Sequence, residues 1–158
     1  MRWLLVFAIA CSKPPVTAPR ASWPDLQPLA GAWTGTSDGG ATVDVTFRPI
    51  ARGSALAETF GKPGRETMTL YHADSGGLVA THYCAQGNQP RLRARQDGKR
   101  FVFTQAEITD LDRAEPHLVE MEIVLGDNVF ARVEVYRAPD GTLERTRWHF
   151  VRVTDSAR

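Results

Sequence analysis

The segment THYCAQGNQPR, residues 81–91, gathers the side chains of this sequence that are best suited to chemistry. His82 and Cys84 are two residues apart, so on a β-strand they share one face and could form a Cys–His nucleophile pair. Catalysis by such a pair also needs an orienting group and oxyanion donors, which no neighbouring motif supplies. A structural cysteine is the better interpretation of Cys84, because free cysteines are commonly buried.

Glu58 is a second candidate for chemistry, because it lies in the mostly apolar run SALAETF. An inward carboxylate at this position would be costly without a partner, and Arg91 is a candidate partner. The pattern favours the other interpretation, in which Glu58 lies on the outer face of a short strand.

The four histidines, His72, His82, His117 and His149, occur without an HExxH or CxxC motif, so no protein-ligated metal is predicted. Counting back from a turn at residues 74–77 puts Thr69 opposite His82, which directs the imidazoles of His72 and His82 to opposite faces of the sheet. His149 could bind haem, but its strand parity, opposite to that of Trp148 and Phe150, predicts an outward position. Haem is therefore possible but not favoured.

The overall charge gives no reason to expect a nucleic-acid partner. The 158 residues carry a formal net charge of +1 at pH 7. Arg93, Arg95 and Arg100 share one face of a predicted hairpin, but an acidic loop follows them and offsets their charge.

Short runs of alternating apolar and polar residues predict the elements that position these side chains. They indicate about ten antiparallel strands joined mainly by hairpins. Before them, WPDLQPLAG predicts one helical turn with Pro24 near its start. A sandwich and an up-and-down barrel both fit, and consecutive hairpins without a long crossover favour the all-β barrel, as a single domain over residues 24–154.

Two hairpins predict specific registers. A turn at Asp97 and Gly98 would pair Ala94 with Phe101 and Leu92 with Phe103. A turn at residues 138–141 would pair Glu134 with Arg145, which defines an inward set. That set is Val129, Ala131, Val133, Val135, Trp148 and Phe150.

The hairpin that contains the motif has one face that is more apolar than the other. Met68, Leu70, Val79 and Tyr83 make up that face. We therefore expect Thr81, Tyr83 and His72 to point into the barrel, and His82 and Cys84 to point outward.

The N-terminus, MRWLLVFAIAC, is typical of a compact export signal. Its apolar run is far shorter than the ~20 residues that a membrane-spanning helix needs. The pattern resembles a bacterial lipoprotein signal over residues 1–11, with lipidation of Cys11 and a Pro-rich tether over residues 12–23. Such a protein would be exported and lipid-anchored on the periplasmic side of the envelope. A cleaved secretory signal, which would leave the protein periplasmic, and a cytosolic protein with an apolar start are the alternatives.

The segments LAGAWTGTS, GSALAETF, MTLYHAD and LVATHYCAQGNQPRLRA resemble a family of uncharacterised bacterial proteins. That family is calycin-like, meaning related in fold to lipocalins and nitrobindins, and its members often carry export signals. Its hallmark is Leu-x-x-Thr-His-Tyr-Cys followed by Gly-Asn-Gln-Pro-Arg. The resemblance implies a ten-stranded barrel with a small apolar-lined interior. Relatives have a His-Met-His run where this chain has His117 and then Val119.

We expect an exported, lipid-anchored barrel that binds a small, largely apolar molecule and contacts the membrane through its anchor. In this reading Asn88, Gln89 and Arg91 tie down a loop at one barrel end. The alternatives are an enzyme with His82 as acid and base, and a filled barrel that serves as an interaction module. The candidate ligand-binding residues are Glu58, His72, Thr81, His82, Tyr83, Asn88, Gln89, Arg91 and His117.

Overall fold

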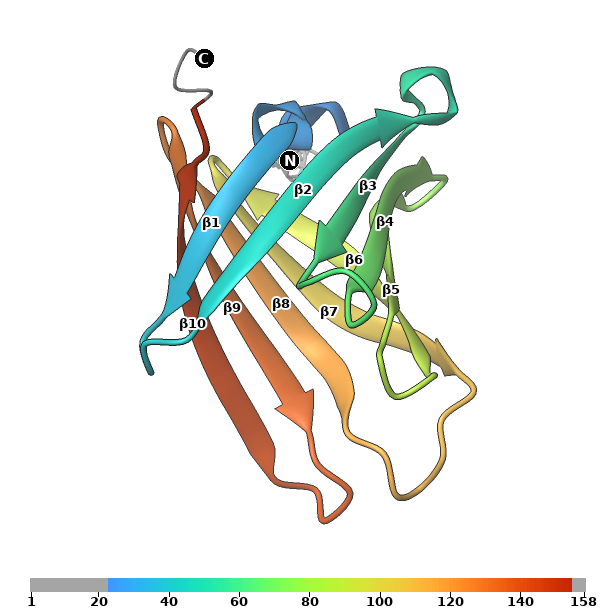
Figure 1. The fold of residues 1–158 in the computed structure, drawn as a ribbon. Helices are drawn as coiled ribbons and strands as arrows, with labels where there is room; N and C mark the ends of the chain where they lie inside the picture. The colour runs from blue at the N-terminus through green and yellow to red at the C-terminus, as the bar shows by residue number, and fades with distance from the viewer. Residues whose placement is uncertain (1–22, 155–158) are drawn as a thin grey trace, which may run out of the picture.

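A computed structural model describes residues 23–154, and these form one closed antiparallel barrel (Figure 1). Each strand pairs with the next along the chain, and β1 pairs with β10 to close the barrel. The strands are β1 (Gly31–Ser37), β2 (Thr42–Ile50), β3 (Ala55–Phe60), β4 (Thr67–Asp74), β5 (Gly77–Tyr83), β6 (Gln89–Asp97), β7 (Arg100–Thr109), β8 (His117–Leu125), β9 (Val129–Arg137) and β10 (Leu143–Arg152). The up-and-down ten-strand barrel predicted from the hairpins is confirmed.

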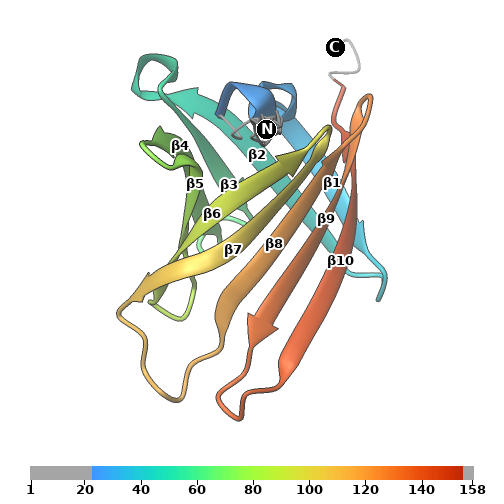
Figure 2. The ribbon, with the colours of Figure 1, turned by 180° about the vertical axis from the view of Figure 1, so that it is seen from behind.

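A 3-10 helix, η1 (Trp23–Leu29), precedes β1, and a short second one, η2 (Ala51–Gly53), links β2 to β3. The predicted helical turn is therefore confirmed, although Trp23 begins it rather than ending the tether. Both ribbon views show η1 across one end of the barrel, which we call the proximal end (Figure 2). The loops at residues 38–41, 61–66, 84–88, 110–116 and 138–142 lie at the other, distal end.

The proximal end is held closed by contacts between η1 and the two strands that close the barrel. Trp33 Nε1 on β1 donates to the Leu29 carbonyl at 2.7 Å. The Arg152 guanidinium on β10 donates to the Pro28 and Ala30 carbonyls and lies 4.2 Å from the centre of the Trp33 ring. The last residue of the barrel thus fastens the segment that precedes the first strand.

Aromatic side chains fill the interior next to η1. Phe130 stacks on Phe150 with ring centroids 4.2 Å apart, and Trp33 meets Phe130 edge-on at 4.9 Å. Gly35 on β1 makes room for this stack, since a Cβ there would lie 2.3 Å from the Phe150 ring. This half of the barrel is a packed hydrophobic core.

The predicted strand registers agree with the structure in one hairpin and differ from it in two others. Thr69 lies opposite His82, as predicted. In the β6–β7 hairpin Asp97 pairs with Arg100, so Ala94 lies opposite Phe103, and the predicted register is wrong by two residues. An even shift leaves every side chain on its predicted face.

The β9–β10 register is wrong by one residue, and this changes which face of β9 points into the barrel. Arg137 pairs with Leu143, so the turn is one residue longer than predicted, and Glu134 lies opposite Thr146 rather than Arg145. A one-residue shift moves a whole strand to the other face. The inward side chains of β9 are therefore Phe130, Arg132, Glu134 and Tyr136, while Val129 is 47 % exposed and Val129, Ala131, Val133 and Val135 lie on the outer face. The inward positions of Trp148 and Phe150 are confirmed.

The faces of β4 and β5 are also the reverse of the prediction. Thr69, Tyr71 and His82 are buried, whereas Tyr83 is 45 % exposed and Met68 42 %. His72 and Thr81, expected to point inward, lie with Tyr83 on the outer face. The more polar face points inward because it meets charged partners from β3 and β9.

Candidate functional site

A group of three charged side chains lies inside the barrel. Arg132 on β9 donates to Glu58 on β3 and contacts Glu134 at 2.6 Å. The side chains of Arg132 and Glu58 are each 1 % exposed, and that of Glu134 is 10 % exposed. We call these residues the ion triad. Glu58 is thus an inward carboxylate, contrary to the prediction, and its partner is Arg132 rather than Arg91.

The triad is completed by an aromatic hydroxyl and an aromatic face. The Tyr71 hydroxyl donates to Glu58 Oε2 at 2.5 Å, and the Arg132 guanidinium lies 5.0 Å from the centre of the Phe60 ring. Burial, and then the charge of Glu58, raise the pKa of Tyr71, so this phenol stays protonated and donates. Arg132 Nε is buried without a partner among the described residues.

Arg132 remains a cation in this setting. Burial alone would lower the pKa of Arg132, but the charges of Glu134 and Glu58 outweigh it and hold the pKa above its usual range. One guanidinium therefore faces two carboxylates inside the barrel.

His82 lies next to the triad and bridges two hydroxyl groups. Its Nδ1 is 3.0 Å from Thr69 Oγ1, and its Nε2 is 3.3 Å from the Tyr136 hydroxyl. Burial, and then the charge of Arg132, lower the pKa of His82 to about 3. The imidazole is neutral near pH 7, so one ring nitrogen donates and the other accepts.

A less buried layer lies on the distal side of the triad. Phe60 and Trp148 meet edge-on with ring centroids 5.5 Å apart, and both are partly exposed, as is Tyr136. Trp148 Nε1 is buried without a partner among the described residues. Thr146, with the same parity as Trp148 and one step closer to the distal rim, is exposed. The distal half of the interior thus presents partly exposed aromatic rings and, among the described residues, an indole N–H without a partner.

Part of the THYCAQGNQPR motif, residues 81–91, lies on the outside of the barrel. Thr81, Tyr83, Gln89 and Arg91 line an outer groove of 190 Å³ with residues of β7. Arg91 contacts Asp74 at 3.1 Å and Glu107 at 3.6 Å, and Thr109 donates to Gln89 at 2.7 Å. The Arg91 contacts join β6 to β4 and β7 rather than to the motif loop.

Asn88 fixes the distal loops. It is fully buried, and its Nδ2 donates to Glu115 Oε2 and to the Pro116 carbonyl, both at 3.2 Å. The motif loop is thereby tied to the loop that precedes β8. There His117 is partly buried, and its Nδ1 has no partner within residues 23–154. Asn88 Oδ1 is likewise buried without a partner among the described residues.

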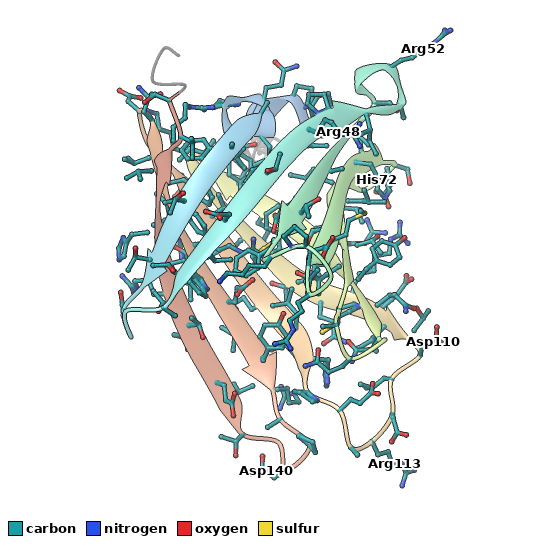
Figure 3. All side chains as sticks on the ribbon, in the orientation of Figure 1. Arg48, Arg52, His72, Asp110, Arg113 and Asp140 are labelled. Carbon is teal, nitrogen blue, oxygen red and sulfur yellow. The ribbon has the colours of Figure 1, made fainter. Side chains whose placement is uncertain are left out.

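The remaining candidates lie away from the triad. His72 is on the outer side of β4 near the proximal end, where its Nδ1 lies 3.1 Å from the Ala73 carbonyl (Figure 3). His149 points outward, as predicted, 3.3 Å from Asp38. The Cys84 thiol donates to Gln86, and burial raises its pKa, which makes it a weak nucleophile. Cys11 lies outside the described residues.

Sequence reasoning missed most of the interior polar residues. Tyr71, Arg132, Glu134 and Tyr136 were not singled out, because on β4 and β9 they alternate with the more apolar set. The spacing of Arg132, Glu134 and Tyr136 at every second residue was the available signal. It becomes informative only when the length of the β9–β10 turn is known.

Within residues 23–154 no group of three or more His, Cys, Asp or Glu side chains is placed to hold a metal ion. Among the same residues, no helix combines the length and apolar character needed to span a bilayer. No protein-family model matches the chain, and no curated protein matches its sequence.

Proposed function

We propose that the barrel binds a small, largely apolar molecule in the distal half of its interior. A polar group of that molecule would hydrogen-bond to the layer formed by His82, Glu134 and Tyr136. The observation that carries this proposal is the buried ion triad, which lies where a structural barrel would hold apolar side chains.

The energetic argument rests on the cost of burying charge. Replacing a buried ion pair by well-packed apolar residues is often neutral or stabilising by a few kcal/mol. Arg132 Nε also has no hydrogen-bond partner in the described part of the chain. A barrel selected for stability alone would therefore not need these residues, whereas ligand sites commonly combine an apolar wall with a few convergent polar groups.

The distal layer supplies the complementary apolar surface. Phe60 and Trp148 offer ring faces that are only partly covered, and Trp148 Nε1 is a donor without a partner among the described residues. A flat or aliphatic molecule with one hydrogen-bonding group fits this combination.

The calycin-like family and envelope attachment belong to the same proposal. A closed ten-strand barrel is the architecture that the motif resemblance implies, and it supports the assignment. Lipidation of Cys11 would hold the barrel at the periplasmic side of the envelope. Replacing Cys11 by Ser should release the protein from the membrane fraction, and unchanged membrane association would reject the anchor.

Acid–base catalysis by His82 has less support. A general base works best with a pKa near the working pH. The pKa of about 3 makes the buried imidazole a weak base, so its role in this site is to hold the Tyr136 hydroxyl in place.

The binding proposal can be tested on the full chain. Native mass spectrometry of protein purified from its own envelope should show a bound small molecule. A second arm titrates the purified protein with N-phenyl-1-naphthylamine, an apolar probe with one N–H group, and follows its fluorescence.

A matched pair of tyrosine variants shows whether N-phenyl-1-naphthylamine binds in the interior or on the outer face. Tyr136→Phe removes the hydroxyl beside His82 and should weaken probe binding about fivefold, the value of one buried hydrogen bond. Tyr83→Phe makes the same change on the outer face and should leave the affinity unchanged. Absence of both a co-purified molecule and probe binding, or equal effects of the two variants, would contradict the proposal.

A further inference from the structure

The distal part of β10 is a sheet edge inside an otherwise closed barrel. β1 pairs with β10 only from Arg152 to Trp148, and one further bond joins the Asp38 N–H to the Arg147 carbonyl at 3.1 Å. Residues 143–146 of β10 continue along β9 with no backbone partner from β1 among the described residues.

The direction of the free backbone groups follows from strand geometry. Backbone groups of alternate residues point to opposite sides of a strand. Because the Arg147 carbonyl faces β1, the N–H and C=O of Arg145 and Leu143 face the same side. The N–H and C=O groups of Thr146 and Glu144 face β9. Arg145 therefore offers a donor and an acceptor to a further strand.

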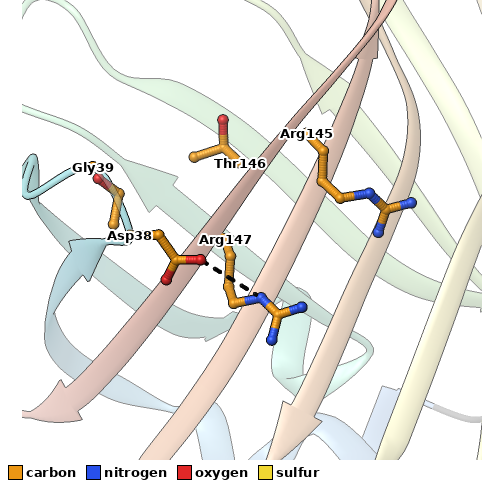
Figure 4. Close-up of a pocket in the computed structure, with 6 residues that line it drawn as sticks. Asp38, Gly39, Arg145, Thr146 and Arg147 are labelled. Carbon is orange, nitrogen blue, oxygen red and sulfur yellow. Dashed lines mark ion pairs between the residues drawn. The ribbon is translucent and has the colours of Figure 1, made fainter.

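A pocket of 510 Å³ lies beside this edge (Figure 4). It is lined by Ser37, Asp38, Gly39, Arg145, Thr146 and Arg147. In the close-up the Arg145 and Arg147 side chains extend to the same side of β10, with Asp38 beside Arg147. The edge thus opens onto this pocket, and no other strand of residues 23–154 pairs with it.

The two arginines are only loosely paired. Arg147 is 3.9 Å from Asp38, and Arg145 is 3.9 Å from Glu120, with both guanidinium side chains more than half exposed. A carboxylate brought in by a partner could therefore approach either of them more closely than their present partners do.

A second copy of this chain does not fit the edge. In an antiparallel pairing of β10 with itself, directly opposed residues must share a face, so a two-fold axis passes through one residue. An axis at Glu144 opposes two glutamates, and an axis at Arg145 or Arg147 opposes two arginines. An axis at Thr146 opposes Arg145 to Arg147. The registers centred on Glu144, Arg145, Thr146 and Arg147 place like charges together, and a register centred on Leu143 would pair β10 with the turn at residues 139–142, which is not extended; both disfavour self-pairing.

We propose that the free edge of β10 binds an extended acidic peptide segment, which adds a strand antiparallel to residues 143–146. Main-chain hydrogen bonds to Arg145 and Leu143 would hold the segment, and an acidic side chain opposite Arg145 would also lie diagonal to Arg147, within reach of both guanidinium groups. This interaction surface is on the outside of the barrel and is independent of the interior ligand site.

The first test uses a fluorescein-labelled peptide, Val-Glu-Val-Glu-Val with blocked ends, and fluorescence anisotropy. The peptide with lysine at both glutamate positions should bind about tenfold more weakly, as expected for two cross-strand charge pairs. N-methylation of the backbone at the residues that face β10 should abolish binding. N-methylation at the alternate residues should leave binding unchanged.

The second test follows individual amides by hydrogen exchange measured with NMR. The Arg145 amide should exchange rapidly in the free protein and become protected when the acidic peptide is added. The Thr146 amide faces β9 and serves as an internal control, protected in both states. The R145E/R147E variant should reverse the preference and select the lysine peptide.

Three outcomes would overturn the proposal. If neither N-methylation pattern changes the affinity of the peptide, the peptide binds through its charges and not through main-chain hydrogen bonds. An Arg145 amide that stays unprotected with peptide bound would place the peptide elsewhere. A concentration-dependent dimer with this amide protected in the absence of peptide would assign the edge to a second copy.

Discussion

Replacing Arg132 by Met is the most direct way to measure what the ion triad contributes. The variant keeps the volume of the side chain but leaves Glu58 and Glu134 as buried carboxylates without their cation. Breaking a buried pair by removing one partner typically costs about 3–5 kcal/mol. Because small domains are stable by about 5–15 kcal/mol in total, this loss should be visible as a large shift of the denaturation midpoint.

A fully apolar replacement separates the net value of the triad from the cost of breaking it. The variant E58L/Y71F/R132M/E134L removes every member together with the hydroxyl that bonds to Glu58. We expect its free energy of unfolding to lie within about 2 kcal/mol of the natural chain, because no unpaired charge remains. It should also lose binding of N-phenyl-1-naphthylamine, since the polar layer that holds the probe is disrupted.

Urea denaturation followed by circular dichroism measures both variants, with Arg100→Met as a matched control. Arg100 forms a similar pair with Glu122 at 2.8 and 2.9 Å, but on the exposed surface, so its loss should change stability little. A deficit equal to that of Arg100→Met would refute the reasoning.

Three further predictions concern other parts of the barrel. The pKa of His82 is lowered from 6.5 to about 3, so the unfolded chain binds more protons than the folded chain between these pH values. On acidification below pH 6.5 this residue should therefore lower the free energy of unfolding by about 1.4 kcal/mol per pH unit. Urea titrations of His82→Gln should lack that loss. Gly35→Ala should cost about 1–3 kcal/mol by overpacking against Phe150, measured by thermal unfolding, and Phe150→Leu in the same chain should recover part of the loss. Arg152→Ala should increase hydrogen exchange in η1, and Arg152→Lys should restore part of the protection, because the guanidinium binds the Pro28 and Ala30 carbonyls. Equal exchange in the natural chain and both variants would show that Arg152 does not hold η1.

The two proposed sites use different parts of the same strand pair. Arg132 and Glu134 of β9 serve the interior, whereas Arg145 and Arg147 of β10 serve the exterior edge. Because the charged groups of the two sites point to opposite faces, variants of one should leave the other unaffected. This independence allows the interior ligand and the edge partner to be tested separately in one protein.

The sequence by itself determined the architecture, because alternation and short glycine-containing turns are local properties. Val43, Val45 and Phe47 alternate with polar residues, and the turn at residues 38–40 joins their strand to its neighbour as predicted. The β4–β5 register also followed from its turn. A correct register did not by itself decide the face, because β4 and β5 paired as predicted but with the opposite face inward.

Only the tertiary structure decided which face of β4, β5 and β9 points inward. On these strands the apolar set lies outside, and the polar set lies inside because charged groups from β3 and β9 meet there and pair. Glu58 and Arg132 are 74 residues apart in the chain, and no local pattern specifies their contact. One extra residue in the β9–β10 turn changed the inward-pointing set of β9 from four aliphatic positions to Phe130, Arg132, Glu134 and Tyr136, and so created the interior site.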